Sequence, residues 1–437
     1  MTAVVYALGV VVFLLGVALS IALHEMGHMW PAKKFGVKVT QFFVGFGRTV
    51  WSFRRGETEY GLKAIPLGGF VKLVGMLPPE RGVGSADGDP QHARTSNTGL
   101  FTQLASDARQ LEYETVTTAD TDRLFYRKPW WQKVIVMAGG PTVNLLIATL
   151  LFAVSFMGFG VAMPTTTVGQ VADCAITDAE AGRACTDADP PTPARQAGLQ
   201  AGDLITSFDG EQVTSWDQLT RLIRANGDQT ATMSFERDGS ERTVDVTTSV
   251  LARAALDDPE RVENVGFLGV TPTVEVERQG PLFVVEEMGR MISQTAEAIV
   301  HLPARMVEVV KAVFGAEREQ DGPISIVGAS RVAGELVTVD QPTFAEGTQR
   351  IITLLAGLNL FLWLFNLIPL LPLDGGHIAG ALWEALRRGW ARLRGRPDPG
   401  YVDVAKMLPV AYAVGSVLML MGVVLIFADI VNPVSLL

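Results

Sequence analysis

The sequence predicts a polytopic α-helical membrane protein with four transmembrane helices, a β-rich region after the first of them and a separate α+β domain. Hydrophobic residues make up 48% of the 437 residues, and the mean hydropathy is positive. Four apolar runs approach or exceed the roughly 20 residues that a helix needs to cross a bilayer. Polar segments of different charge balance lie between them, so the chain is too long and too varied for one compact domain.

The first span is predicted over residues 1–31. Residues 3–23 contain no Asp, Glu, Lys, Arg or His. This run lacks the basic start and the small-residue cleavage site of a signal peptide, so we expect it to be retained. It ends in a His-Glu-x-x-His motif formed by His24, Glu25 and His28.

The His-Glu-x-x-His motif predicts a metal site. Residues four apart lie on one face of a helix, so His24 and His28 can bind the same ion. Glu25 lies beside them, where a carboxylate can take a proton from a metal-activated water. The alternative is a chance match, because the motif alone is a weak signal. Its position at the end of an apolar span favours the metal site, since ionisable groups at membrane depth are costly and usually functional.

Residues 32–76 and 77–128 differ in character. The first segment contains β-branched and aromatic runs separated by glycine and turn residues, which predicts hairpins. We interpret it either as a small sheet with no role in the chemistry or as a membrane-associated edge strand that pairs with an extended substrate. The second segment is mostly polar, without apolar periodicity, and is predicted to be a cytoplasmic insertion.

A second span is predicted over residues 129–163. It begins with basic and aromatic residues that are typical of a membrane interface, and it contains a Gly-Gly-Pro sequence at residues 139–141. Asn144 is a polar group at membrane depth. It is either a functional residue or part of a helix contact in which small neighbours allow close packing.

Residues 164–275 are predicted to form an α+β domain, with a helix at residues 216–225. Residues 276–347 are predicted to form an amphipathic helical segment that leads to the membrane. Residues 164–347 carry 30 acidic and 14 basic residues. The two cysteines of the chain, Cys174 and Cys185, lie in this acidic part. They form either a disulfide or two free buried thiols.

The last two spans are predicted over residues 348–376 and 406–433, with a cytoplasmic connection over residues 377–405. Residues 32–132 contain 14 Lys and Arg residues, five arginines lie between the last two spans, and both termini lack basic residues. Basic loops remain in the cytoplasm. We therefore expect a multi-pass protein of the cell membrane, with the acidic domain and both termini outside the cytoplasm.

This topology brings two distant segments to one membrane depth. The first and third spans both enter from outside, so His24, His28 and Asp374 all arrive near the cytoplasmic face. A catalytic zinc commonly takes three protein ligands and a water, so Asp374 can complete the site. His377 is the competing third ligand. Two histidines and a carboxylate also suit iron, so Zn²⁺ is inferred from ligand type.

Together these features resemble the site-2 protease family of intramembrane zinc metalloproteases, peptidase family M50. The resemblance rests on the motif at residues 24–28, the glycine-rich β-region, Gly-Pro-x-x-Asn at residues 140–144, and Asn-x-x-Pro-x-x-x-Leu-Asp-Gly-Gly at residues 366–376. The four-span plan looks closest to bacterial RseP-type enzymes. The single PDZ-like domain and the polar insertion look more like actinobacterial Rip-type members.

The resemblance implies that His24, His28 and Asp374 are zinc ligands and that Glu25 is the general base. It implies that Asn366 and Asn144 contact the substrate, and that the α+β domain is an extracytoplasmic PDZ-like domain. The implied partners are membrane lipid and transmembrane substrates, such as anti-sigma factors. An upstream site-1 protease would usually trim those substrates first.

The residues also allow other functions. A non-catalytic membrane scaffold that binds peptide termini through a PDZ-like domain would not need all of His24, Glu25, His28 and Asp374. A metal transporter would carry more polar residues along its spans, and the fourth span has almost none. A membrane-anchored protease for soluble substrates fits less well with the membrane depth of the motif. The net charge of −10 argues against nucleic-acid binding.

Overall fold

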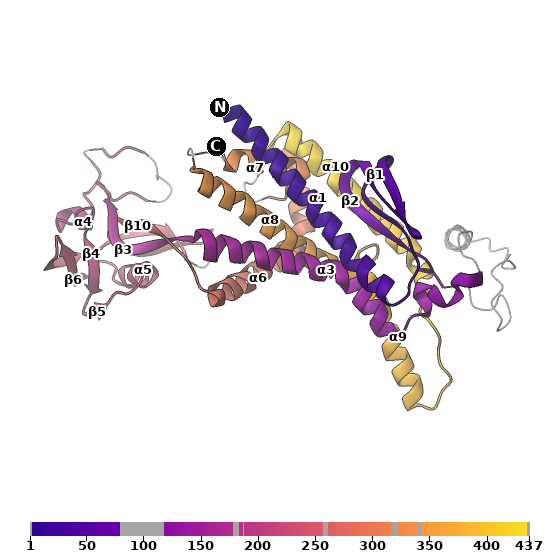
Figure 1. The fold of residues 1–437 in the computed structure, drawn as a ribbon. Coiled ribbons are helices and arrows are strands. Elements are labelled where there is room, and N and C mark those ends of the chain that lie inside the picture. Colours follow the sequence, from indigo (N-terminus) through magenta and orange to yellow (C-terminus); the bar gives the residue numbers. More distant parts are fainter. Residues whose placement is uncertain are drawn as a thin grey trace. The chain divides into compact units, whose positions relative to one another are not determined.

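The structure is a computed structural model, and it describes residues 2–78, 118–177, 183–186, 188–256, 261–316, 318, 322–339 and 342–434. Most of the predicted polar insertion lies outside the described residues. The chain divides into two compact units (Figure 1). Unit 1 comprises Met1–Phe159 and Gly280–Leu437, and unit 2 comprises Gly160–Gln279.

Unit 1 is built mainly from helices. They are α1 (Thr2–Lys34), α3 (Trp130–Ala153), α6 (Pro281–Val313), α7 (Ile326–Leu336), α8 (Phe344–Asn366), α9 (Asp374–Leu393) and α10 (Leu408–Val431). A π-helical turn, η4 (Val154–Phe159), extends α3, and a 3-10 turn, η6 (Val404–Met407), precedes α10. By length and composition, four helical segments can cross a membrane: Thr2–Lys34, Trp130–Phe159, Phe344–Asn366 and Val404–Val431. The prediction of four apolar spans is therefore confirmed.

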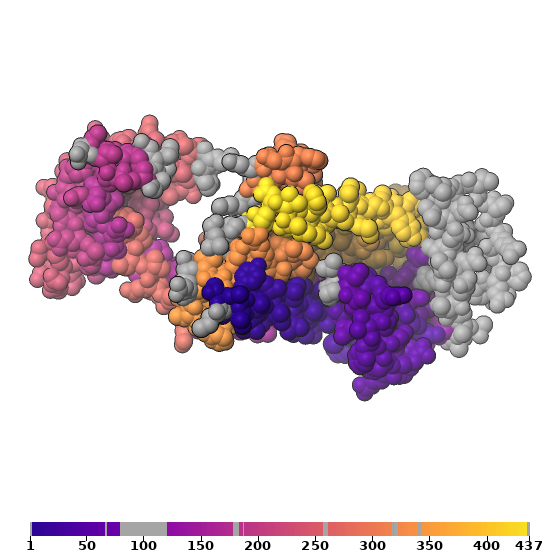
Figure 2. Space-filling view, turned by 90° about the horizontal axis from the view of Figure 1, so that it is seen from above, coloured from indigo at the N-terminus to yellow at the C-terminus, as the bar shows by residue number. Residues whose placement is uncertain are grey.

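The outer surfaces of these helices are apolar. Leu15 and Leu19 of α1, and Met419 and Val423 of α10, are all exposed. Figure 2 shows α1 (indigo) and α10 (yellow) on the surface of unit 1. A large exposed apolar surface is unfavourable in water, whereas in lipid it needs no protein partner.

Helices α1, α3 and α8 pack against one another in unit 1. Phe13 of α1 and Leu355 of α8 are buried in one apolar cluster. A buried hydrogen bond joins the same two helices, because the Asn359 amide nitrogen donates to Ser20 Oγ at 3.0 Å. His24 lies one helical turn after Ser20, so this contact fixes the position of the histidine motif relative to α8.

The β-rich region is a two-stranded antiparallel sheet made of β1 (Val39–Arg55) and β2 (Thr58–Leu73). Both strands bend, so that Phe42 pairs with Tyr60 and also with Val71. The first half of β1 therefore lies between the two halves of β2, and residues 69–73 form one edge of the sheet. Two 3-10 turns, η2 (Thr118–Arg123) and η3 (Phe125–Arg127), follow the gap in the described residues.

The segment predicted as a connection between the last two spans contains a long helix, α9. It packs along α3. Within this contact, Lys133 Nζ of α3 donates to Glu384 Oε2 at 2.7 Å. Asp374 was predicted at the end of the third span but is instead the first residue of α9. The two residues are 251 positions apart in the chain, so the local sequence pattern does not reveal their contact.

Unit 2 is an α+β unit. Its elements are β3 (Val161–Val171), α4 (Pro193–Gln196), β4 (Leu204–Phe208), β5 (Glu211–Gln212), α5 (Trp216–Ala225), β6 (Thr230–Arg237), β7 (Ser240–Thr247), β8 (Ser249–Ala254), β9 (Val262–Phe267) and β10 (Val270–Glu277). The main sheet has the order β10-β3-β4-β6-β7, with β5 paired to β4, and β8 pairs with β9. The predicted helix at residues 216–225 is confirmed. Leu219 on this helix is buried in the core with Ile205 and Met233 of the sheet.

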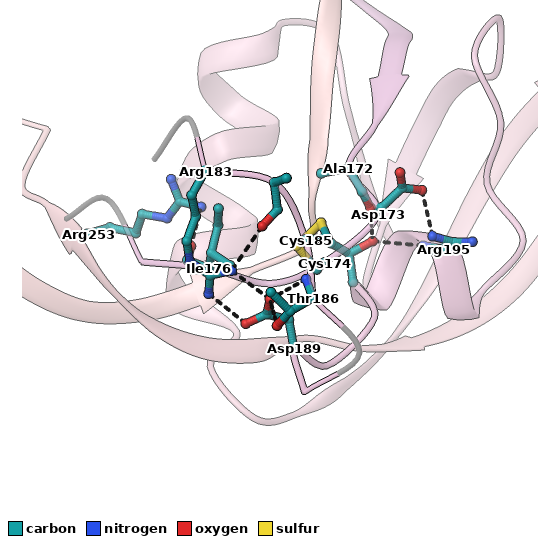
Figure 3. The surroundings of a disulfide bond; sticks show 12 residues. Ala172, Asp173, Cys174, Ile176, Arg183, Cys185, Thr186, Asp189, Arg195 and Arg253 are labelled. Atoms are coloured by element: carbon teal, nitrogen blue, oxygen red, sulfur yellow. Dashed lines mark hydrogen bonds and ion pairs between the residues drawn. A yellow bond between two sulfur atoms is a disulfide. The ribbon is translucent and has the colours of Figure 1, made fainter. Parts of the chain in front are cut away.

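Cys174 and Cys185 form a disulfide in unit 2 (Figure 3). Ion pairs surround it: Arg183 contacts Asp189, and Arg195 contacts Asp173. Of the two alternatives that the sequence left open, the structure has the disulfide and not the free thiols.

A buried carboxylate links strand β6 to the turn before β4. Asp203 is buried and accepts two hydrogen bonds from Arg237, at 2.6 and 2.7 Å, and one from the Gln200 N–H at 2.8 Å. Burial alone would raise the pKa of Asp203, but these hydrogen bonds outweigh it and hold the pKa below its usual value. Because the folded pKa lies below the unfolded value of about 3.9, the ionised carboxylate stabilises unit 2 above that pH, and this stabilisation is lost as the pH falls through the folded pKa.

Asp203→Asn is therefore expected to lower the thermal unfolding midpoint of unit 2 at pH 7, by about 5–10 °C. The difference from wild type should be constant above about pH 5 and should shrink as the pH falls toward 2. The unfolding midpoint of each protein is measured by limited proteolysis within residues 160–279 during heating. Glu241→Gln removes an exposed carboxylate of the same unit and serves as the control. A difference between Asp203→Asn and wild type that does not change with pH would contradict this account.

Candidate active site

Three side chains from opposite ends of the chain meet in unit 1. His24 Nε2 and His28 Nε2 lie 3.2 Å apart. Asp374 Oδ2 lies 3.4 Å from the first and 3.3 Å from the second. Within the described residues this is the one group of three or more His, Cys, Asp or Glu side chains whose ligand atoms lie so close together. His377, the competing ligand candidate, is not part of it.

A zinc ion fits these three atoms. Zinc binds nitrogen and oxygen ligands at about 2.0–2.1 Å in tetrahedral geometry, so two of its ligand atoms lie about 3.3–3.4 Å apart. The three distances in the cluster agree with this spacing. Asp374 Oδ2 is also buried without a hydrogen-bond partner among the described residues. Three converging lone pairs repel one another unless a cation lies between them.

Helix α3 sets the tautomer of His28. Its Nδ1 lies 2.8 Å from the backbone oxygen of Val136. A carbonyl oxygen can only accept a hydrogen bond, so Nδ1 carries the proton and donates. The lone pair of Nε2 then points toward His24 and Asp374, which is the arrangement that a metal-binding histidine needs.

Helix α3 also approaches α1 closely behind the histidines. A Cβ atom on Gly140 would lie 2.3 Å from His28 Nε2, and one on Gly139 would lie 2.0 Å from the backbone oxygen of Gly27. Any larger residue at either position would have to displace the histidine motif. The sequence left two alternatives open for this segment, and the glycines show the helix contact in which small residues allow close packing. Their contact with the histidines was not predicted.

Glu25 faces the β-sheet. A Cβ atom on Gly69 would lie 2.9 Å from Glu25 Cγ. The sheet edge at residues 69–73 therefore runs beside this carboxylate. Glu25 itself is half-buried.

The two predicted substrate-contact residues are placed differently. Asn144 is 1% exposed, and neither atom of its amide has a hydrogen-bond partner among the described residues. It lies one turn after Gly140, on the same face of α3 as that glycine. Asn366 is the half-buried last residue of α8, separated from Asp374 by the turn at residues 367–373. The contact of Asn359 with Ser20 was not predicted, although a polar residue inside an apolar span is itself a signal.

The charge state of the cluster follows from the cation that it would hold. To hold a cation together, Asp374 must be ionised, and His24 and His28 must be neutral imidazoles. Burial lowers the pKa of His377, which favours its neutral form.

Comparison with known proteins identifies the family. The sequence profile of peptidase family M50 matches residues 12–407. The chain belongs to peptidase family M50. It is 33% identical to the zinc metalloprotease Rip1 of Mycobacterium tuberculosis (strain ATCC 25618 / H37Rv), over 99% of each chain. It is 33% identical to Rip1 of Mycolicibacterium smegmatis over 99% of each chain, and 27% identical to the metalloprotease MmpA of Caulobacter vibrioides over 86% of each.

Membership of peptidase family M50 confirms the predicted enzyme class and cofactor. The chain is a zinc metalloprotease of the site-2 type. Its four apolar helices fit a multi-pass membrane protein. The three converging ligand atoms described above are the site in this M50 chain that its zinc would fit.

Proposed function

We propose that this M50 protease cuts the transmembrane segments of single-span membrane proteins inside the membrane. In this proposal His24, His28 and Asp374 hold the zinc and Glu25 is the general base. One observation carries it: three ligand atoms converge where the apolar run of α1 ends, on a helix that is long enough to span a bilayer. Peptide bonds of lipid-embedded helices are the substrate that such a position can reach.

The proposed chemistry divides between the zinc and the chain. Zinc, when bound, supplies the Lewis acidity that polarises a peptide carbonyl and acidifies water. Glu25 takes the proton of the attacking water and passes it to the leaving amine. Its contact with β2 at Gly69 limits the directions in which the carboxylate can turn. The hydrogen bond from His28 Nδ1 to Val136 holds the imidazole in position.

A transmembrane helix must unwind before it can be cut, because its own hydrogen bonds bury every carbonyl. Each backbone N–H or C=O left unpaired in lipid costs several kcal/mol. The sheet edge at residues 69–73 lies beside Glu25 and offers a row of backbone partners to an extended substrate. We propose that the substrate adds to this edge.

The two asparagines provide further partners in this proposal. The Asn144 amide is buried without a partner among the described residues, and such an orphaned group typically costs about 1–3 kcal/mol. A substrate backbone that pairs with it removes this cost. Asn366, at the end of α8, is proposed to contact the substrate backbone from the side of Asp374.

The proposed orientation places the zinc site near the cytoplasmic face and unit 2 outside the cytoplasm. The basic loops support this orientation, and so does the disulfide in unit 2, since disulfides persist in oxidising compartments. We propose that unit 2 is a PDZ-like domain. We also propose that the substrates resemble anti-sigma factors and are first trimmed outside by a site-1 protease.

The test is cleavage of a reporter that contains a single transmembrane helix, with zinc measured on each purified protein. Wild type should contain about one zinc and cut the reporter. Glu25→Gln should keep its zinc and lose at least about 100-fold in cleavage rate, because it removes the general base alone. Asp374→Asn should lose both zinc and cleavage, because it weakens one of three ligands.

The two variants act as controls for each other. Loss of zinc from Glu25→Gln would show that Glu25 is a zinc ligand and not the general base. If all three proteins lacked stoichiometric zinc and left the reporter intact, the proposal would fail and the non-catalytic scaffold would replace it.

A further inference from the structure

Helix α9 carries a basic and aromatic surface that the protease chemistry does not use. Trp383, Leu386 and Trp390 lie three to seven residues apart, so they share one helix face. They are 55%, 61% and 55% exposed. Together with Arg387 and Arg396 they line a groove of about 470 Å³, which we call the α9 groove.

The position of the α9 groove relative to the second span follows from one ion pair. Lys133, near the start of α3, contacts Glu384 in the middle of α9. From Glu384 to its end, α9 continues for about 14 Å at 1.5 Å per residue. Figure 1 shows that α9 extends past the starting end of α3. Arg387 and Arg396 therefore lie beyond this ion pair, toward the end of α3 that begins with Trp130 and Trp131, where lipid headgroups begin.

The charges in the α9 groove leave room for an anion. One N–H group of Arg387 donates to the backbone oxygen of Pro399, at 2.9 Å. A guanidinium has five N–H groups, so four further donors belong to this side chain. Arg396 is exposed and forms no ion pair with any described residue. The nearby carboxylate of Asp398 is paired with Arg388, at 3.3 Å. The net charge of the groove is therefore positive.

We propose that the α9 groove binds one anionic phospholipid, with its phosphate on Arg387 and Arg396 and its glycerol and upper acyl chains on Trp383, Leu386 and Trp390. Arginine pairs favour phosphate because the planar fork of donors matches its oxygens. Exposed tryptophans prefer the membrane interface, and basic pockets at the cytoplasmic side of membrane proteins bind acidic headgroups. An acidic soluble peptide would satisfy the arginines but would not need the adjoining apolar face.

The phospholipid site has a structural consequence for the enzyme. Helix α9 begins at Asp374, and the groove is lined by residues 383–399, in the second half of the same helix and just after it. A lipid in the groove would hold the outer half of α9 at the interface. The inference uses the cytoplasmic orientation proposed above, but it does not require peptide cleavage.

The test is native mass spectrometry of the full-length chain in detergent with added phosphatidylglycerol, and with phosphatidylcholine of the same acyl chains. Wild type is expected to retain one phosphatidylglycerol at least about tenfold more tightly than phosphatidylcholine. The double variant R387Q/R396Q should bind phosphatidylglycerol about 10- to 30-fold more weakly, since each arginine near a headgroup contributes about a fivefold change. R396Q alone, which breaks no described ion pair, should weaken binding about fivefold.

R54Q/R55Q removes the same charge from the exposed end of β1 and is the matched control; it should bind like wild type. Equal losses in both double variants, or equal affinity for the two lipids, would overturn the site. So would equal binding of sn-glycerol 3-phosphate, because the ligand would then be a soluble phosphate compound. The assay works equally with Glu25→Gln protein, so failure of the protease proposal and failure of this one are separate results.

Discussion

Gly140→Ala is expected to remove most of the zinc and nearly all proteolytic activity. The added Cβ would lie 2.3 Å from His28 Nε2 and 2.8 Å from His24 Cε1, so both proposed ligands would have to move. Groups that orient metal ligands typically change metal affinity by about 10- to 100-fold. Displacing two ligands should reach or exceed the upper end of that range. Zinc content and reporter cleavage of the purified variant measure the effect.

Gly422→Ala in α10 is the matched control, because a Cβ there meets no atom within 4 Å. Alanine is the better helix former by about 1 kcal/mol, so a loss seen only in Gly140→Ala cannot come from helix propensity. Normal zinc content and cleavage in Gly140→Ala would show that α1 and α3 separate easily and that their close approach does not position the zinc ligands.

Glu384→Gln is expected to destabilise unit 1 by about 3–5 kcal/mol, because it leaves the ammonium group of Lys133 buried without its counterion. The two side chains are 8% and 2% exposed. Replacing both by apolar residues, as Lys133→Met with Glu384→Leu, should recover most of the loss. Because α9 begins at Asp374, the single variant should also hold zinc less tightly. Denaturant unfolding in detergent and zinc content are the measurements.

The control for the buried pair is Glu308→Gln on α6. Its partner Lys311 lies 2.8 Å away, but both side chains are more than half exposed, and such pairs contribute little. An equal shift of the unfolding midpoint in Glu384→Gln and Glu308→Gln would contradict the special role of the buried pair.

The four spans could be predicted because length and apolar composition are local properties of the sequence. The candidate site could be predicted for a different reason. His24 and His28 are related by helix periodicity, and the charge of the loops placed Asp374 at the same membrane depth. No local signal gives the 3.2–3.4 Å spacing of the three ligand atoms; that spacing depends on how α1, α3 and α9 pack.

The missed features all depend on contacts between distant residues. Helix α9 was predicted as a connection because its arginines and exposed apolar residues do not show the partner, Lys133, which lies 251 residues away. The bend that pairs Phe42 with two segments of β2 requires a choice of register that alternation alone does not specify. The contact of Gly140 with His28 is visible only when two helices are placed side by side.

The distance along the chain between the proposed zinc ligands has a consequence for biosynthesis. Helix α1 leaves the ribosome and enters the membrane long before Asp374 is translated. Two histidines alone are an incomplete zinc site, so the nascent chain cannot be loaded until α8 is inserted and α9 has packed on α3. A protease that cuts helices in the bilayer would thus remain inactive while its first three spans are inserted, and it could gain activity only after α9 has packed.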